Sequence, residues 1–322
     1  MTHQGPRIHP VIVPTSTILQ SFNFYVVESD GALILIDAGL NSKSCWAHFN
    51  QVMNANGFEA ADIDKIILTH SHDDHTGIVH HLLSEHDIPV YAHKNAAPRL
   101  NREWAYLHHR LAFFDQFYEE MGCRERGREH VALLRQRANE KESQALNTDI
   151  SPLQEGDVID GFEVIETPGH WPDHIVLCHR ESGDVFAGDH ILGHISSNAM
   201  MEPDTAGNKQ HALLEYEHSL KKCTDYALQT AYTGHGGVVE NPIALIERRL
   251  RGIDRKSEKI RTLIGKRQPC TADTLARAFY EKAYDREFSL VISEIAGHLD
   301  RLETHQRVTK RKVDAEWVYS LS

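Results

Sequence analysis

Runs of β-branched and other apolar residues, separated by turn residues, open the chain. They predict strands over residues 11–14, 22–27, 32–37, 65–68 and 89–92. Ser29-Asp30-Gly31 predicts a hairpin between the second and third strands. Apolar residues at helical spacing predict helices over residues 42–56 and 77–85. This alternation of strands and helices is typical of a layered α/β protein.

The pattern becomes helical throughout between residues 97 and about 146. Its two long segments, residues 104–120 and 125–138, carry an aromatic stripe that includes Phe113 and Phe117. We interpret this stretch as a helical insertion that follows a strand. Insertions of this size near a loop-built site often form a lid or a substrate wall, and plain packing over the core explains the aromatic residues equally well.

Strand-like runs return after the insertion, over residues 157–160, 162–166, 175–178, 185–187 and 230–232. The remaining chain predicts three helices and a two-stranded ribbon, over residues 241–266, 271–280, 289–306, 308–312 and 317–319. Because 322 residues are many for one core, we expect two domains. These are a catalytic domain at 1–240, with the insertion at about 97–146, and a C-terminal helical, winged-helix-like domain at 241–322.

Composition narrows the class of protein. Apolar residues make up 41% and charged residues 25%, which is typical of a soluble globular protein. No window approaches the roughly 18 uninterrupted apolar residues of a membrane span, and residues 1–6 lack the basic and apolar segments of an export signal. The five cysteines are scattered without a Cys-x-x-Cys pair, so neither a disulfide framework nor a thiolate metal site is expected. We therefore expect a cytoplasmic protein without membrane contact.

The distribution of charge adds one feature. A net charge of −12 disfavours a protein that coats nucleic acid. Residues 241–322, however, hold 17 Lys and Arg against 12 Asp and Glu, so the C-terminal part is the basic end. Such a bias can attract an anionic partner, and it is also what a solvated helical surface produces.

Four side chains of metal-binding type stand within six residues directly after the expected strand at 65–68. The motif His70-x-His72-x-Asp74-His75 occupies the loop at the end of this strand. Residues two apart on an extended segment point the same way, so two imidazoles can meet one cation while a carboxylate and a third imidazole meet a second. These ligands suit zinc. A chain with 23 His places some together by chance, but four ligands in six residues disfavour that reading.

Other expected strands also end in a polar side chain after a small residue or a turn. They end in His170 after Pro168-Gly169, in Asp189 after Gly188, and in His235 after Gly234. Asp37 ends an otherwise apolar strand, where an unpaired carboxylate is costly. It either orients a metal-binding imidazole or caps a turn or helix. We expect the polar strand ends to gather on one rim of the sheets.

These five motifs, in this order, resemble those of the metallo-β-lactamase superfamily of hydrolases over about residues 8–240. The resemblance implies an α/β fold, the αββα sandwich, with two metal ions at one edge. It places His70, His72 and His170 on the first ion, Asp74, His75 and His235 on the second, and Asp189 between both. Both ligand sets are complete, which disfavours a member that has lost catalysis.

The C-terminal domain resembles the extension of one branch of this superfamily. That branch includes broad-specificity hydrolases and some members that cut RNA. Nucleic-acid contacts, if the ribbon makes them, are expected from His305, Arg307, Lys310, Arg311 and Lys312. The domain could equally wall the active site or pair two subunits as a homodimer.

Two cations close together lower the pKa of a water between them, which yields a hydroxide nucleophile near neutral pH. Asp74, His75 and Asp189 are the expected catalytic residues, and Asp74 is also placed to accept a proton. Our leading hypothesis is a dinuclear zinc hydrolase that cleaves an ester, thioester or amide-like bond of a small metabolite. Alternatives are a phosphodiesterase or ribonuclease on the same metals, and a non-hydrolytic iron redox or signalling member. The same ligands accept Mn or Fe.

The loop that follows Asp189 is long and irregular, and loops at that rim usually shape specificity. Ser196, Ser197 and Asn198 are therefore expected to contact the substrate. His174, four residues after His170, either orients a ligand or packs at the start of a hairpin, and we favour packing.

Overall fold

Two β-sheets pack face to face in the computed structural model, which describes residues 5–140 and 142–322. Residues 1–4, where we expected no export signal, lie outside the described residues. The first sheet has the order β1-β2-β3-β4-β5-β6, formed by Arg7–Pro14, Ser21–Ser29, Ala32–Ile36, Lys65–Ile67, Val90–His93 and Ile150–Leu153. The second has the order β11-β10-β9-β8-β7, formed by Thr230–Thr233, Asp184–Gly188, Ile175–His179, Phe162–Glu166 and Val158–Ile159.

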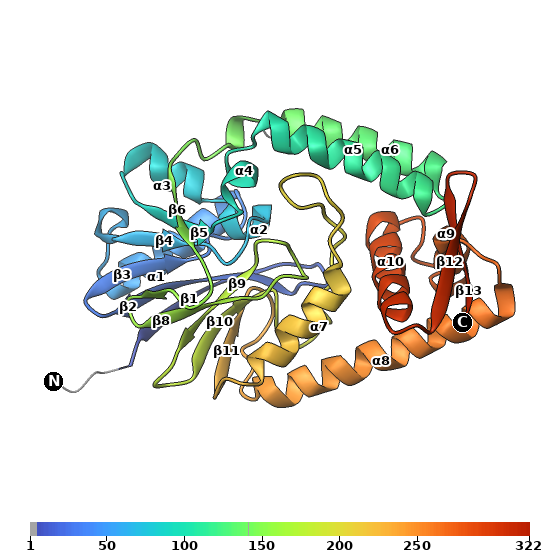
Figure 1. Cartoon of the computed structure of the whole chain (residues 1–322). Helices are drawn as coiled ribbons and strands as arrows, with labels where there is room; N and C mark the ends of the chain where they lie inside the picture. The colour runs from blue at the N-terminus through green and yellow to red at the C-terminus, as the bar shows by residue number, and fades with distance from the viewer. Residues whose placement is uncertain (1–4, 141) are drawn as a thin grey trace.

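Apolar side chains fill the space between the two sheets and cover their outer faces. Ile34 and Ile36 of β3 meet Leu177 and Phe186 of the second sheet in the central core. Helices α1 (Lys43–Asn56) and α3 (Val79–Glu85) share an apolar cluster with the outer face of the first sheet. Helix α7 (Ala212–Cys223) and the first turns of α8 (Pro242–Arg267) do the same for the second sheet. The expected αββα sandwich is therefore present (Figure 1).

Strand direction explains why the polar strand ends meet. Strands β3, β4, β5 and β6 run parallel to one another. Strand β10 runs parallel to β11 and antiparallel to β9, which is itself antiparallel to β8. The carboxyl ends of β8, β10 and β11 therefore lie at one edge of the second sheet, where the loops that follow them can meet the loop that follows β4.

The helical insertion packs against the C-terminal elements. It consists of α4 (Ala97–Leu100), α5 (Trp104–Glu120), α6 (Arg124–Glu140) and the short η2 (Glu142–Gln144). The C-terminal part adds α9 (Ala272–Phe279), α10 (Phe288–Thr304) and the hairpin of β12 (Val308–Val313) and β13 (Glu316–Leu321). Phe114, Phe117 and Tyr118 of α5 belong to the same buried cluster as Leu299 of α10 and Tyr319 of β13. The aromatic stripe of the insertion thus faces this second core.

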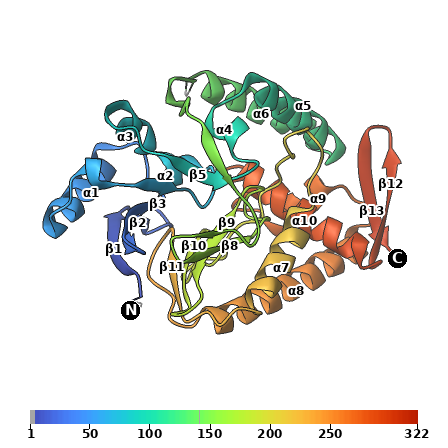
Figure 2. The ribbon, with the colours of Figure 1, turned by 60° about the vertical axis from the view of Figure 1, so that its left-hand side comes forward.

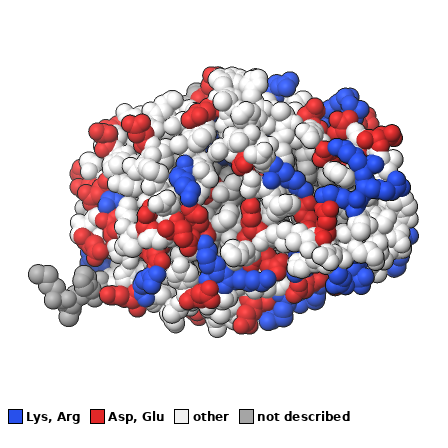
Figure 3. Space-filling model, viewed as in Figure 1, with Lys and Arg blue, Asp and Glu red and all other residues white. Residues whose placement is uncertain are grey.

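Figures 1 and 2 show how the two parts are arranged. The α5/α6 hairpin lies over the edge of the sandwich and reaches the β12/β13 hairpin, while the long helix α8 runs along the opposite side from the sheets to α9. On the face in Figure 3, Asp and Glu are frequent over the sheets, and Lys and Arg gather toward the C-terminal side. Among the described residues, no helix combines the length and apolar character that a membrane crossing needs.

Most expected elements occur within one or two residues of their observed bounds. The expected strand at 11–14 differs, because β1 begins four residues earlier, at Arg7, and the short helix α2 (Asp73–Thr76), which was not expected, precedes α3. Helix α8 begins at Pro242, after the N-cap Asn241 whose side chain accepts a hydrogen bond from Ala244 N. The C-terminal part contains the expected three helices and ribbon, and its winged-helix character and its boundary at 240/241 stay predictions.

Candidate metal centre

The loops at one edge of the two sheets bring all seven expected ligands together. They form two groups in which the potential ligand atoms all lie within 4.8 Å of one another, namely His70, His72, His170 and Asp189, and Asp74, His75 and His235. Except for His72 and Asp74, which are partly exposed, these side chains are buried. Both groups therefore open to solvent on the side of the loop that follows β4.

In the first group, three imidazole rings and one carboxylate point at a common position. His72 Nδ1 lies 2.9 Å from His70 Nε2 and 3.3 Å from His170 Nε2. His170 Nε2 lies 3.5 Å from Asp189 Oδ2. Three imidazole nitrogens and one carboxylate oxygen at such separations match a tetrahedral zinc ligand set.

In the second group, Asp189 again supplies a contact. Its Oδ1 lies 3.4 Å from His75 Nε2, and its Oδ2 lies 3.3 Å from His235 Nε2. His235 Nε2 is also 3.5 Å from Asp74 Oδ2. Asp189 thus touches both groups, which is the position that the resemblance gives it.

Asp37 holds the second group in place. Its Oδ2 is 2.8 Å from His75 Nδ1 and accepts a hydrogen bond from Thr69 Oγ1, also at 2.8 Å. Its Oδ1 accepts a third hydrogen bond from Thr69 N. Because His75 Nδ1 is engaged by this carboxylate, its Nε2 is left to face Asp189. Of the two roles expected for Asp37, the structure therefore shows the first, because Asp37 orients the imidazole of His75.

Other ligands are oriented by groups that the sequence pattern did not single out. His235 Nδ1 lies 2.9 Å from the carbonyl oxygen of Ser21. His170 Nδ1 lies 2.9 Å from the carbonyl oxygen of Asn198 and 3.0 Å from Ser197 Oγ. These partners come from distant segments and carry no motif of their own, so only the folded chain reveals them.

His174 also has a part in the site. Its Nε2 accepts a hydrogen bond from the backbone N of Asp189 at 3.2 Å, and its Nδ1 lies 2.8 Å from Thr167 Oγ1. The ring is buried, and burial together with His190 holds its pKa well below the usual value. We favoured a packing role for His174, and the structure shows that it also fixes the backbone of Asp189.

Two glycines let the backbone pass close to the ligands. A Cβ atom on Gly188 would lie 2.6 Å from Thr69 Oγ1, and one on Gly234 would lie 2.5 Å from Asp189 Oδ1. Gly188 also has a φ of +46°, which favours glycine. Any larger residue at either position would displace a ligand or its support.

The electrostatics of the cluster favour a cation. Burial and the neighbouring histidines hold the pKa of His70 well below its usual value, so its ring is neutral and can donate a lone pair. Burial opposes protonation of His75, but Asp37 and Asp189 outweigh it and raise the pKa of His75 well above its usual value. A positive charge is thus stabilised between His75 and Asp189, and a metal ion supplies one.

Two buried polar atoms of the cluster have no hydrogen-bond partner in the described part of the chain, which agrees with a bound metal. Among the described residues, His75 Nε2 and Asp189 Oδ1 are buried without a hydrogen-bond partner, although they lie 3.4 Å apart. Buried polar atoms are rarely left unsatisfied in native proteins. Two such atoms that face one position inside a ring of ligands fit a metal ion there.

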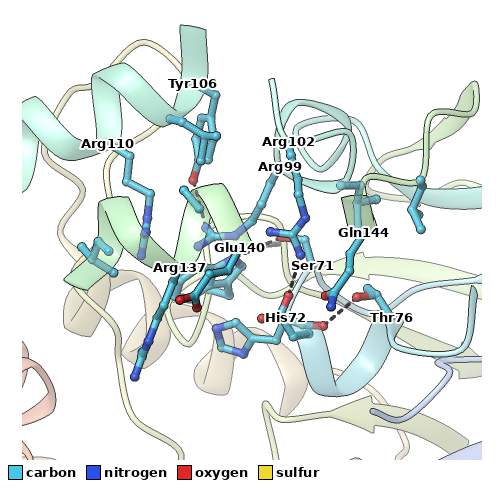
Figure 4. A pocket seen from close by; sticks show the side chains of 17 residues that line it. Ser71, His72, Thr76, Arg99, Arg102, Tyr106, Arg110, Arg137, Glu140 and Gln144 are labelled. Carbon is cyan, nitrogen blue, oxygen red and sulfur yellow. Dashed lines mark hydrogen bonds and ion pairs between the residues drawn. The ribbon is translucent and has the colours of Figure 1, made fainter. Parts of the chain in front are cut away.

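A cavity of about 600 Å³ adjoins the cluster at His72. The metal-binding loop forms one wall, and α4, α5 and α6 form the opposite wall (Figure 4). Next to His72, the Trp171 ring lies 4.0 Å from the imidazole ring, and the Arg99 guanidinium lies 3.9 Å from the Trp171 ring centre. The helical insertion therefore walls the space beside the metal centre, as one of our two readings of it expected.

The loop after Asp189 packs against the C-terminal helices. Ser196, Ser197 and Asn198 line a second cavity of about 270 Å³, which lies against α8 and α10. Arg249 of α8 donates to the carbonyl oxygen of Leu192 at 2.8 Å and fixes the loop there. The loop also supports His170, through the Asn198 carbonyl, the Ser197 hydroxyl and the backbone N of Met200, which donates to the His170 carbonyl at 3.3 Å. Its expected contact with substrate stays a prediction.

The chain is similar to several known proteins. A model described as the metallo-beta-lactamase superfamily matches residues 21–235. The probable metallo-hydrolase YqjP of Bacillus subtilis is 31% identical over 298 residues, which span 92% of each chain. An atrochrysone carboxyl ACP thioesterase of Passalora fulva is 26% identical over 88% of this chain and 73% of its own. The crystal structure of a metallo-beta-lactamase family protein from Thermus thermophilus has a TM-score of 0.77 at 20% identity and covers 99% of both chains.

Proposed function

The chain belongs to the metallo-beta-lactamase superfamily of hydrolases, and we propose that it is a dinuclear zinc enzyme that cleaves an ester, thioester or amide-like bond of a small metabolite. The observation that carries this proposal is the convergence of seven ligand side chains in two groups that share Asp189. Histidine and carboxylate ligands without cysteine suit zinc and also accept Mn or Fe.

Each ligand group would hold one ion. His70, His72 and His170 would bind the first, Asp74, His75 and His235 the second, and Asp189 would contact both. When bound, such a pair of cations lowers the pKa of a water held between them and stabilises the charge that develops on a carbonyl oxygen.

The side chains around the centre have distinct tasks. Asp74 is the partly exposed carboxylate of the cluster, so it is placed to accept the proton that an attacking water releases. Asp37 and the Ser21 carbonyl keep the rings of His75 and His235 in one orientation, which avoids reorganisation during the reaction. Trp171 shields His72 from bulk water on one side.

One of the two relatives favours a thioester among the candidate bonds. One is described as a metallo-hydrolase and another as an acyl-carrier thioesterase, and both align over most of this chain. The volume of the cavity beside His72 also suits a small molecule, because about 600 Å³ lies within the range of roughly 300–1,000 Å³ that is usual for ligand pockets.

The C-terminal ribbon gives weaker support to the nucleic-acid alternative. Of its expected contact residues, Lys310 pairs with Glu303 at 2.6 Å, Lys312 with Glu120 at 2.9 Å, and Arg307 with Glu258 at 3.2 Å. Neutralised cations release fewer counterions from a phosphate backbone, so they contribute less to binding. We propose that the C-terminal part instead supports the α5/α6 wall, with which it shares a core.

The test combines elemental analysis of the purified protein with a substrate panel. The panel contains an ester, a thioester, a lactam, a phosphodiester and single-stranded RNA, each assayed as purified and after chelation and re-addition of Zn, Mn or Fe. We expect bound metal and thioester or ester hydrolysis that a chelator abolishes. Hydrolysis of only the phosphodiester or RNA would replace the proposal by its alternative, and metal-free protein with full activity would overturn it.

A further inference from the structure

Four arginines line the cavity beside His72. Arg99, Arg102 and Arg110 come from the α4/α5 side and reach toward the metal-binding loop, and Arg137 comes from α6 (Figure 4). Among the described residues, two carboxylates share the lining with them, Asp73 and Glu140. The cavity that adjoins the metal centre is therefore rich in guanidinium groups.

Two of these arginines already have firm partners. Arg110 Nε donates to Glu202 at 2.7 Å, in a pair that is almost fully buried on the carboxylate side. Arg99 stacks on the Trp171 ring at 3.9 Å and donates to Tyr106 Oη at 2.9 Å. These contacts fix the wall, so Arg110 and Arg99 serve mainly to shape the cavity.

The other two arginines are better placed to bind a ligand. Arg137 is exposed and has no hydrogen bond or ion pair with any described residue. Arg102 donates to Asp73 at 3.0 Å, but its Nε is buried without a hydrogen-bond partner in the described part of the chain. A guanidinium presents its N–H groups in a planar fork that matches a carboxylate or a phosphate.

We propose that this cavity binds an anionic group of the substrate, a carboxylate or a phosphate, through Arg137 and Arg102. The proposal rests on the proposed function and names its substrate class: an acyl thioester or ester that carries a negative charge away from the bond to be cleaved. The reacting bond lies at the His72 side of the cavity, and the anionic group lies toward α6. Binding energy from that group orients the substrate for attack.

The test uses three thioester probes that differ in the place of the charge. Butyryl-N-acetylcysteamine is neutral, succinyl-N-acetylcysteamine carries a carboxylate on the acyl side, and butyryl-coenzyme A carries phosphates on the leaving group. The Arg137→Gln variant is compared with Arg135→Gln, a matched control on the same helix whose side chain is exposed and does not line the cavity.

We expect Arg137→Gln to raise KM for one of the charged probes about tenfold while kcat changes by less than about twofold. KM for the neutral probe should stay unchanged, Arg135→Gln should alter none of these values, and Arg137→Lys should fall between wild type and Arg137→Gln. The probe that responds identifies the anion as a carboxylate or a phosphate. An equal effect on neutral and charged probes, or no effect on either charged probe, would overturn the proposal.

A binding measurement separates this proposal from the proposed function. Calorimetric titration of the purified protein with succinate and with coenzyme A needs no turnover. If no member of the substrate panel is cleaved but Arg137→Gln weakens binding of either anion and Arg135→Gln does not, anion binding by the cavity holds and the hydrolase proposal fails. If thioesters are cleaved and both variants bind each anion as wild type does, the cavity proposal fails alone.

Discussion

The metal-ligand cluster and the arginine-lined cavity meet at His72, yet the chain builds them in different ways. The cluster takes its side chains from loops at the carboxyl ends of strands, and most of its rings are held by a buried carboxylate, hydroxyl or carbonyl. The cavity takes three of its four arginines from helices and Arg102 from the turn between α4 and α5, and Arg102 and Arg137 are only partly buried or exposed.

Because of this difference, the cluster would determine the chemistry of the reaction, and the arginine-lined cavity would determine which substrates bind. Substitution of a metal ligand whose ring is held by a second residue would destroy the centre. Substitution of an arginine on a helix surface has little effect on the fold. One strand-edge cluster can therefore serve several substrates when the helices around it vary. If the two regions are independent, a substitution in one should leave the properties of the other unchanged.

The largest effect is expected from Asp189→Ala, which removes the carboxylate that touches both ligand groups. Because a metal pair supplies several kcal/mol of transition-state stabilisation, we expect hydrolysis to fall by about 1,000-fold or more. Initial rates on a thioester that the wild type hydrolyses measure this loss. Circular dichroism shows whether the chain stays folded. Turnover at the wild-type rate in a folded variant would exclude Asp189 from the reaction.

A smaller effect is expected from Asp37→Asn, which keeps the shape but loses one acceptor for the His75 and Thr69 hydrogen bonds. Loss of such a support typically lowers metal affinity or activity by about 10- to 100-fold. Competition with a chelator measures the affinity. Asp64→Asn is the control, since Asp64 also accepts a backbone hydrogen bond, from Leu33 N, but makes no contact with the ligands.

Arg137→Gln is expected to act on the other region alone. Its metal content and its kcat on the neutral thioester should equal those of the wild type, although KM for the charged probe rises by about tenfold. Combined with Asp37→Asn, the two effects should multiply, because the residues share no partner. A double variant that departs strongly from the product would show that the regions are coupled.

The smallest effect concerns a network between α7 and α10 whose ion pairs, among the residues that the structure describes, include no expected ligand and no cavity arginine. Burial would raise the pKa of Glu217 in α7, but hydrogen bonds from Arg301 and Lys221 lower it to about 2. A lowered pKa in the folded state adds stability that is present above the unfolded pKa and is lost as the pH falls from about 4.5 toward 2. We expect Glu217→Gln to reduce the difference in unfolding free energy between neutral and acid pH by about 1 kcal/mol. The effect is no larger because solvent screens the network.

Denaturant titrations at pH 7 and at pH 3 measure this contribution. Glu181→Gln serves as the control, since Glu181 is exposed in a turn. Hydrolysis by Glu217→Gln at neutral pH should equal that of the wild type. An unchanged difference in unfolding free energy between the two pH values would show that the ion pair adds nothing to stability.

The gathering of the seven expected ligands could be predicted because each stands in a loop that follows an apolar strand, and strand direction then brings these loops to one edge. The supports of these ligands could not be predicted in the same way. Asp37 was visible as a carboxylate at a strand end, whereas the Asn198 carbonyl and Ser197 hydroxyl that hold His170 depend on the path of an irregular loop. Backbone groups carry no signal in the residue pattern.

Some of the fold was missed for other reasons. Strand β6 contains Pro152, which argues against a strand interior, and it lies at the edge of its sheet, where proline is tolerated. Helix α7 did carry a signal, since Leu213, Tyr216 and Leu220 recur at helical spacing and are buried together. The arginine-lined cavity exists only because α5 and α6 fold back over the metal-binding loop, which local sequence does not specify.

Metal stoichiometry tests the central claim most directly, namely that two ligand groups hold two ions through a shared Asp189. Elemental analysis of purified wild type and of His235→Ala, both confirmed as folded, gives the number of ions per chain. We predict two ions in the wild type and about one in His235→Ala, because His235 belongs only to the second group. Equal metal content in the two proteins, or a wild type that binds no metal, would contradict the claim.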